Sequence, residues 1–161
     1  AGHGVQTRDD RFFFWNHDFD FDQPAETGLD FLTLGDIVTA FPTELVMLID
    51  ACHAGLAGAA AVSNLRPEEM FKRLMAINER AQTIFSATQK NELALEHEPF
   101  GHGLFTKAIL DTMEQNPAGA EVSVLQLIDN TQRIVRGWSD GRQVPSVRVY
   151  GDLFRLVVFR K

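Results

Sequence analysis

Cysteine is nearly absent from this chain of 161 amino acids, which contains only one. A single cysteine cannot form an internal disulfide, and this favours a reducing compartment, so we expect a cytoplasmic location. Long hydrophobic runs are also missing, because no apolar stretch approaches the roughly 18–20 residues that span a bilayer. The N-terminus lacks the basic and apolar segments of a signal peptide. We therefore expect no membrane partner.

Positively charged residues are also relatively few. The chain has 15 Lys and Arg residues against 22 Asp and Glu residues, which gives a formal net charge of −7. Because phosphate binding draws on clustered Lys and Arg, this balance argues against nucleic acid as a partner. The acidity suits a cationic substrate instead. The length and the hydrophobic content of 45% are ordinary for one globular domain with a buried core.

Short apolar runs predict several strands. The expected strands are 11–15, 45–50, 82–87 and 153–159. The run at 45–50 is continuous, as in a central strand that is covered on both faces. Residues 17–22 alternate Phe with Asp, which predicts a half-buried extended segment with Phe inward and Asp in solvent. Residues 23–28 are then expected to form a turn.

Segments with helical spacing of apolar residues alternate with these strands. The expected helices are 33–41, a helix that starts at Pro67, 103–113 and 122–135. Thr33 with Asp36 three residues later predicts the N-terminal cap of the first helix, and Pro42 predicts its end. Alternating strands and helices predict an α/β protein with a mainly parallel sheet and helices on both faces.

The only cysteine, Cys52, follows the apolar run at 45–50 by two residues. A lone cysteine is often a buried small hydrophobe, and that interpretation stays open at this point. The small residues at 54–64, however, favour a thiol that emerges where a substrate can approach. In parallel sheets the chemistry gathers at the carboxyl ends of the strands, which is where Cys52 is expected. As a thiolate it would be a nucleophile, activated by a nearby histidine.

Three histidines are candidates to serve Cys52. His53 is adjacent, but consecutive residues of an extended segment point to opposite faces, which makes it a poor partner. His3 and His102 each stand in a GHG triplet, and they lie almost symmetrically about the cysteine in the sequence. Spacing alone leaves both of them open.

Three stretches together resemble the caspase-like cysteine peptidases, namely AGHGV at 1–5, LIDACHAG at 48–55 and FSATQKNELALEHEPFGHGLFTKAILDTM at 85–113. The D-x-C-H-x-G form of the cysteine motif is similar to that of the metacaspase and bacterial caspase-homologue branch. In caspases the catalytic histidine stands roughly 50 residues before the cysteine, and this rule selects His3. The resemblance implies one peptidase domain over 1–161, with a three-layer α/β/α sandwich.

The resemblance also implies what is missing. Complete caspase-like domains have strands and a helix before the histidine, so we expect the N-terminal strands to be absent from this chain. An uncovered apolar sheet edge is prone to pairing. A partner segment or chain is therefore expected to complete the sheet.

By resemblance, the chain is a cysteine endopeptidase. Cys52 would be the nucleophile and His3 the general acid/base, with a thioester intermediate. The backbone N–H groups of Gly4 and Cys52 would form the oxyanion hole. His102 would only pack against or cap a helix that its GHG triplet opens. The alternative is a catalytically silent caspase-like module for regulation or assembly.

Asp50 is the expected source of substrate specificity. In the metacaspase branch the acid two residues before the cysteine lines the primary pocket and pairs with an Arg or Lys before the scissile bond, which implies a protein or peptide substrate of that kind. A buried unpaired carboxylate is costly, so a cation that fills the pocket is favoured. Alternatively, Asp50 only ends the strand and accepts hydrogen bonds from loop N–H groups. Ser86 and Ala87 match the position where family members align backbone against an extended substrate.

Calcium activates many metacaspases through a cluster of aspartates, and the sequence does not match such a site. Counted as an EF-hand loop from Asp18, the sixth position is Gln23 rather than Gly and the twelfth is Leu29 rather than Glu. The family's acid seven residues after the cysteine is replaced by Ala59. We therefore expect no metal ligands and no cofactor, and the resemblance alone leaves activation by calcium open.

Activation by self-cleavage, as in a zymogen, is common in the family. Basic residues that could be cut lie in or near the connections after the cysteine, and these are Arg66, Arg73 and Lys90.

Overall fold

The computed structural model describes residues 2–7, 9, 11–41, 43–53, 82–88, 94–97, 102–153 and 155–161. The chain divides into two compact units. The N-terminal unit comprises Gly2–Thr43 with Ala51–Arg80, and the C-terminal unit comprises Glu44–Asp50 with Ala81–Lys161. In the part that is described, no helix is both long and apolar enough to cross a membrane.

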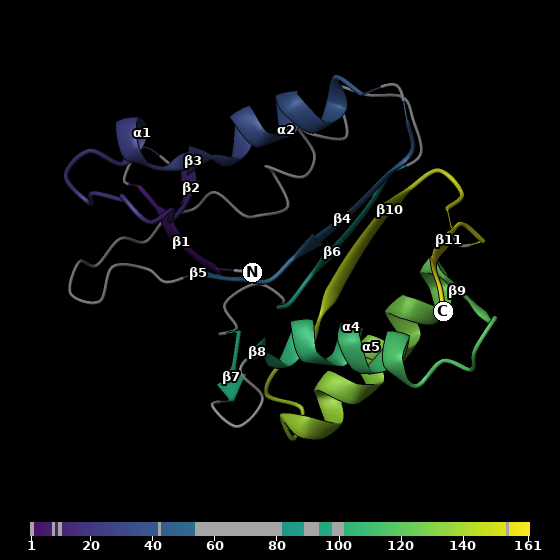
Figure 1. Cartoon of the computed structure of the whole chain (residues 1–161). Coiled ribbons are helices and arrows are strands. Elements are labelled where there is room, and N and C mark those ends of the chain that lie inside the picture. Colours follow the sequence, from purple (N-terminus) through teal and green to yellow (C-terminus); the bar gives the residue numbers. More distant parts are fainter. Residues whose placement is uncertain are drawn as a thin grey trace. The chain divides into compact units, whose positions relative to one another are not determined.

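The N-terminal unit is built on a four-stranded sheet in the order β3-β2-β1-β5 (Figure 1). These strands are β1 (Gly2–Gln6), β2 (Phe12–Phe14), β3 (Leu29–Asp30) and β5 (Ala51–His53). The β1–β5 pair is parallel, whereas β1–β2 and β2–β3 are antiparallel. The described residues of this unit include two helices, α1 (Pro24–Thr27) and α2 (Phe31–Thr39).

Phenylalanine side chains form the core of the N-terminal unit. Phe12, Phe13 and Phe31 are buried together with Val5. The Phe12 ring meets the Phe14 ring edge to face at a centroid distance of 5.1 Å, and it meets the Phe31 ring in the same way at 6.3 Å. Such pairs stabilise a core beyond the area that they bury. The strand predicted at 11–15 is therefore confirmed as β2.

The prediction for 17–22 is wrong. These residues form turns rather than an extended segment, although Asp18, Asp20 and Asp22 are exposed as expected. Phe21 is 50% exposed, so the Phe side chains are not uniformly inward. The period of two arises instead because Phe19 and Phe21 pack on one tryptophan, Trp15. The turn predicted at 23–28 contains one helical turn, α1.

Helix α2 begins two residues before the predicted start and has a different cap. Its N-cap is Asp30, whose Oδ1 accepts a hydrogen bond from the Leu32 N–H at 3.2 Å, so the cap predicted at Thr33 is wrong. Asp30 Oδ2 also accepts a hydrogen bond from Arg11 Nη2 at 2.8 Å, and this bond raises the pKa of Arg11 further above its ordinary value. The predicted apolar face is only partly buried, because Ile37 and Phe41 are exposed.

The C-terminal unit contains a three-stranded sheet in the order β10-β6-β4 (Figure 1). Its strands are β4 (Leu45–Ile49), β6 (Gln82–Ser86) and β10 (Ser146–Tyr150). Two further ladders join β9 (Glu121–Ser123) with β11 (Val157–Arg160), and β7 (Glu96–His97) with β8 (His102–Gly103). Helices α4 (Leu104–Glu114) and α5 (Val124–Trp138) complete the unit.

The core of this unit lies between β6 and its two helices. The buried members of the cluster are Phe85, Ala87, Phe105, Ile109, Val122, Val124, Leu127 and Ile128. Phe85 of β6 meets Phe105 of α4 edge to face at a centroid distance of 4.8 Å. Helices α4 and α5 therefore share one buried cluster with β6.

The prediction of a mainly parallel sheet is wrong for the described residues, where the sheets are mixed. Of the seven ladders found there, only β1–β5 and β4–β6 are parallel. Among the described residues β4 stands at one end of the strand order, and Leu48 is 41% exposed, so β4 is not covered on both faces there. Sequence reasoning also missed the antiparallel strand β10, although SVRVY alternates apolar and polar residues.

Replacing Asp30 by Ala tests the observed cap of α2. The variant loses the N-cap acceptor and the partner of Arg11, so we expect the free energy of unfolding to fall by about 1–2 kcal/mol in urea denaturation. The matched control is Thr33→Ala, because Thr33 is the cap that the sequence favours and is exposed within α2. We expect that control to change stability by less than about 0.5 kcal/mol. A larger loss for Thr33→Ala than for Asp30→Ala would contradict the observed capping.

Candidate active site

His3 and Cys52 occupy neighbouring strands of the N-terminal unit. In the parallel β1–β5 ladder their Cα atoms are register partners, with Gly2 opposite Ala51 and Gly4 opposite His53. Neighbouring strands lie about 4.8 Å apart. Two residues separated by almost fifty positions in the sequence are therefore brought together by a backbone ladder rather than by a flexible loop.

The His3 side chain is exposed and lies against an aromatic ring. Its imidazole centroid is 5.2 Å from the ring of Trp15, with the planes tilted by 47°. The His3 carbonyl oxygen accepts a hydrogen bond from the Trp15 N–H at 3.0 Å. An exposed imidazole is free to exchange protons with a substrate or with water.

Gly4 lies inside β1, with Phe14 opposite it on one side and His53 on the other. A Cβ atom at this position would lie 2.1 Å from Cζ of Phe12, whose ring is buried. Only glycine fits there without moving the core. The same ladder holds His53 opposite Gly4, one position beyond the His3 pair.

Asp50 lies at the end of β4 in the C-terminal unit, and its carboxylate caps helix α4. Its Oδ2 accepts two hydrogen bonds from Thr106, from the backbone N–H at 3.2 Å and from Oγ1 at 2.5 Å. The N-cap residue of α4 is Gly103, which has no side chain to offer. A Cβ at Gly103 would lie 2.8 Å from Asp50 Oδ2, so glycine permits the close approach.

The capping contact bears on both interpretations of Asp50, as a residue that binds the substrate and as a residue that ends the strand. A carboxylate at a helix N-terminus accepts orphan N–H groups and interacts favourably with the helix dipole. This resembles the alternative in which Asp50 ends the strand, although the donors belong to a helix rather than to a loop. Both of these hydrogen bonds engage Oδ2, and Oδ1 accepts none from the described residues. Thr106 is a contributor that sequence reasoning missed, because its hydroxyl partner lies 56 residues away.

Ser86 and Ala87 follow one another at the end of β6. Ser86 is paired on both sides, with Ile49 of β4 and Ser146 of β10. The Ala87 N–H donates to the Ile49 carbonyl at 2.8 Å, and the Ala87 carbonyl accepts from Gln143 Nε2 at 2.9 Å. A substrate that pairs with Ala87 would have to replace these bonds.

Gln143 is a second residue that sequence reasoning missed. It is fully buried, and its Oε1 accepts from the Leu95 N–H at 2.9 Å while its Nε2 serves Ala87. A buried amide with both ends satisfied stabilises the segments that it joins. It therefore ties the residues after β6 to those before β7. No signal in the polar stretch around Gln143 identifies this role.

The second GHG triplet opens helix α4, as expected. His102 belongs to β8 as the register partner of His97, and Gly103 is the N-cap of α4. The expected self-cleavage sites Arg66, Arg73 and Lys90 lie outside the described residues, as do Ala59 and the helix predicted from Pro67. Within the described ranges, no group of three or more His, Cys, Asp or Glu residues could hold a metal ion.

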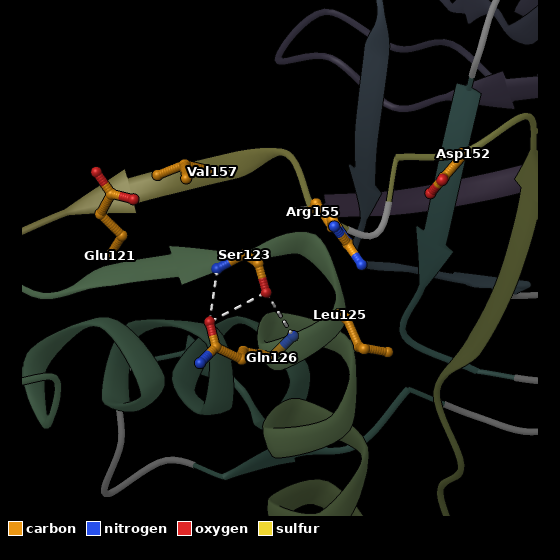
Figure 2. Close-up of a pocket in the computed structure, with 7 residues that line it drawn as sticks. All are labelled: Glu121, Ser123, Leu125, Gln126, Asp152, Arg155 and Val157. Atoms are coloured by element: carbon orange, nitrogen blue, oxygen red, sulfur yellow. Dashed lines mark hydrogen bonds between the residues drawn. The ribbon is translucent and has the colours of Figure 1, made fainter.

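A pocket of about 590 Å³ lies elsewhere in the C-terminal unit, at the start of α5. Figure 2 shows its lining residues, and one wall is the capping box in which Ser123 and Gln126 exchange hydrogen bonds. The remaining lining residues come from β9, β11, α5 and the residues before β11. None of the predicted site residues lines this pocket.

Comparison with known protein families shows which family the chain belongs to. The profile of the peptidase family C14, described as the caspase domain, matches residues 1–151, so the chain belongs to the caspase family. This is a family of cysteine peptidases, which are hydrolases. A caspase-like α/β fold follows from the match, and the resemblance to caspase-like cysteine peptidases is confirmed. No curated protein matches the chain.

Substitutions at Asp50 and Thr106 test the capping of α4. Thr106→Val removes the hydroxyl donor to a carboxylate, and we expect it to lower the free energy of unfolding by about 1–2 kcal/mol. Asp50→Ala removes both hydrogen bonds and should cost about 2 kcal/mol. Because the two residues share one interaction, the double variant should lose less than the sum, with a coupling energy of about 1 kcal/mol by urea denaturation. Additive losses would show that the contact contributes nothing to stability.

Proposed function

We propose that the chain is a cysteine endopeptidase that cleaves peptide bonds after Arg or Lys through Cys52 and His3. The observation that carries the proposal is the register pairing of these two residues in the β1–β5 ladder. A nucleophile and its base must lie within hydrogen-bond reach, and adjacent strands bring their residues to that range. Membership of a cysteine peptidase family supports the same chemistry.

The proposed reaction proceeds in two halves. His3 accepts the thiol proton, and the Cys52 sulfur attacks the carbonyl carbon of the scissile peptide bond, so that the electron pair of the C=O moves to oxygen. The C–N bond then breaks, and the imidazolium of His3 gives its proton to the departing amine. A thioester remains on the sulfur. Water, deprotonated by His3, attacks the thioester and releases the acid together with the free thiol.

The oxyanion that forms in each half needs hydrogen-bond donors. We assign these to the backbone N–H groups of Gly4 and Cys52, which lie one register step apart on neighbouring strands. Backbone donors that are already fixed stabilise developing charge without reorganisation. Gly4 needs no side chain for this role, which agrees with the steric reason for glycine at the position.

Asp50 is the proposed determinant of basic specificity. It stands two residues before the nucleophile in the sequence, and one carboxylate oxygen holds α4, while the other has no hydrogen-bond partner among the described residues. A guanidinium or ammonium group would pair with that second oxygen. The net charge of −7 also favours the approach of a cationic substrate. The chemistry needs no cofactor, because the chain supplies nucleophile, base and donors.

A panel of fluorogenic peptides with Arg, Lys, Asp or Leu before the cleaved bond tests the proposal. Wild-type protein should hydrolyse the Arg and Lys peptides, and Cys52→Ala and His3→Gln should each lose about 10³-fold or more in kcat/KM. The matched control is His102→Gln, the histidine of the other GHG triplet, which should keep kcat/KM within about threefold of wild type.

Three outcomes would count against the assignment. Equal turnover by wild type and Cys52→Ala would exclude the nucleophile. Cleavage only after Asp would contradict the role of Asp50. Loss of activity in His102→Gln but not in His3→Gln would reassign the base. A protein with no turnover whose thiol also resists iodoacetamide at neutral pH would instead be the catalytically silent module.

A further inference from the structure

The residue packed directly against the proposed base is Trp15, which follows β2 in the sequence. Its ring centroid lies 5.2 Å from that of His3, and its N–H donates to the His3 carbonyl. Trp15 thus extends the antiparallel β1–β2 ladder by one step beyond the pairing of Gly4 with Phe14. Backbone and side chain of one residue therefore both contact the same histidine.

Other aromatic rings hold Trp15 in place. The Phe19 ring stacks on it at 5.7 Å with an interplanar angle of 18°, and the Phe21 ring meets it edge to face at 4.9 Å. Phe19 and Phe21 also contact each other at 5.2 Å. The turns at 17–22 thereby fold back to support one ring. This explains the alternation of Phe and Asp that a strand does not explain.

A hydrogen bond from the indole N–H does not explain why residue 15 is a tryptophan. Nε1 of Trp15 is buried and has no hydrogen-bond partner among the described residues. An unsatisfied buried donor opposes folding rather than favouring it. The part of Trp15 that makes contacts is the aromatic ring, and its neighbours include the exposed imidazole of His3.

We propose that Trp15 is a positioning residue that orients the His3 imidazole for catalysis. The inference rests on the proposed role of His3 as the general acid/base. An exposed imidazole on a strand has several rotamers, and a fixed ring on one side restricts them. Trp15 itself touches neither the substrate nor the reacting atoms in this role.

Kinetics of Trp15→Leu and Trp15→Phe test the proposal. Trp15→Leu should lower kcat about tenfold with KM unchanged within about twofold, since the base is misoriented and the substrate contacts remain. Trp15→Phe keeps an aromatic face but loses the unpaired N–H and part of the bicyclic ring, so kcat should stay within about threefold of wild type. The matched control is Trp138→Leu on α5, with no expected change in kcat. In a His3→Gln background, Trp15→Leu should add no further loss.

A readout without catalysis separates this proposal from the proposed function. In wild-type protein, NMR should show cross-relaxation between the imidazole protons of His3 and the indole protons of Trp15. The ring current of Trp15 should also shift the His3 resonances, and Trp15→Leu should move them toward those of an unstructured histidine. If no peptide is cleaved but these signals appear, the endopeptidase fails and the orientation of His3 by Trp15 stands.

Three experimental results would contradict the proposal. Absence of His3–Trp15 cross-relaxation in folded wild-type protein would overturn it, and that measurement needs no variant to fold. In an active enzyme, a folded Trp15→Leu protein with wild-type kcat would overturn it as well. A loss in Trp15→Leu that persists undiminished in the His3→Gln background would also do so, because Trp15 would then not act through His3.

Discussion

The parallel pairing of β1 with β5 is the constraint on which the candidate active site depends. It sets His3 opposite Cys52 and Gly4 opposite His53, so one backbone ladder fixes both the proposed base and the nucleophile. A register slip of one residue would move every side chain of a strand to the other face of the sheet. The buried phenylalanines of β2 oppose a one-residue slip of β1 against β2, because the Phe12 ring fits where β1 carries a glycine, at Gly4.

The C-terminal unit applies a similar constraint at Asp50. The carboxylate replaces the missing side-chain cap of α4, and α4 in turn packs through Phe105 on Phe85 of the central strand β6. The end of β4, two residues before the cysteine in the sequence, is thereby held by a helix rather than by loop contacts alone. In the account proposed above, one oxygen of Asp50 serves the fold and the other serves the substrate. The effects of any substitution at Asp50 on the stability of the protein and on its substrate specificity therefore have to be measured separately.

Local patterns in the sequence predicted several helices and strands correctly. Most of the features that were missed or mispredicted depend on contacts between residues far apart in the sequence. The apolar runs at 11–15, 45–50 and 82–87 are strands, and α4 lies where its spacing predicts it. The alternation of Phe and Asp at 17–22 misled because packing on Trp15 produces the same period as a strand. The cap of α2 was misplaced because Asp30 also binds Arg11, which no local rule reveals. Thr106 and Gln143 act on residues 56 positions away, beyond any sequence window. The pair of His3 and Cys52 was found only through the spacing of the family motif. In the structure, the β1–β5 ladder makes these two residues register partners.

The most direct test of the account is a disulfide between positions 3 and 52. The chain has no other cysteine, so His3→Cys creates one defined pair. Register partners on adjacent strands have Cα atoms within the range of roughly 4.4–6.8 Å that a disulfide requires. Mild oxidation of His3→Cys should therefore consume both thiols within one chain, as followed by thiol titration and mass spectrometry. The control Gly2→Cys, one residue out of register and with open space for its Cβ, should keep its thiols free. Free thiols in oxidised His3→Cys, or equal bridging in Gly2→Cys, would contradict the register that brings the proposed base to the nucleophile.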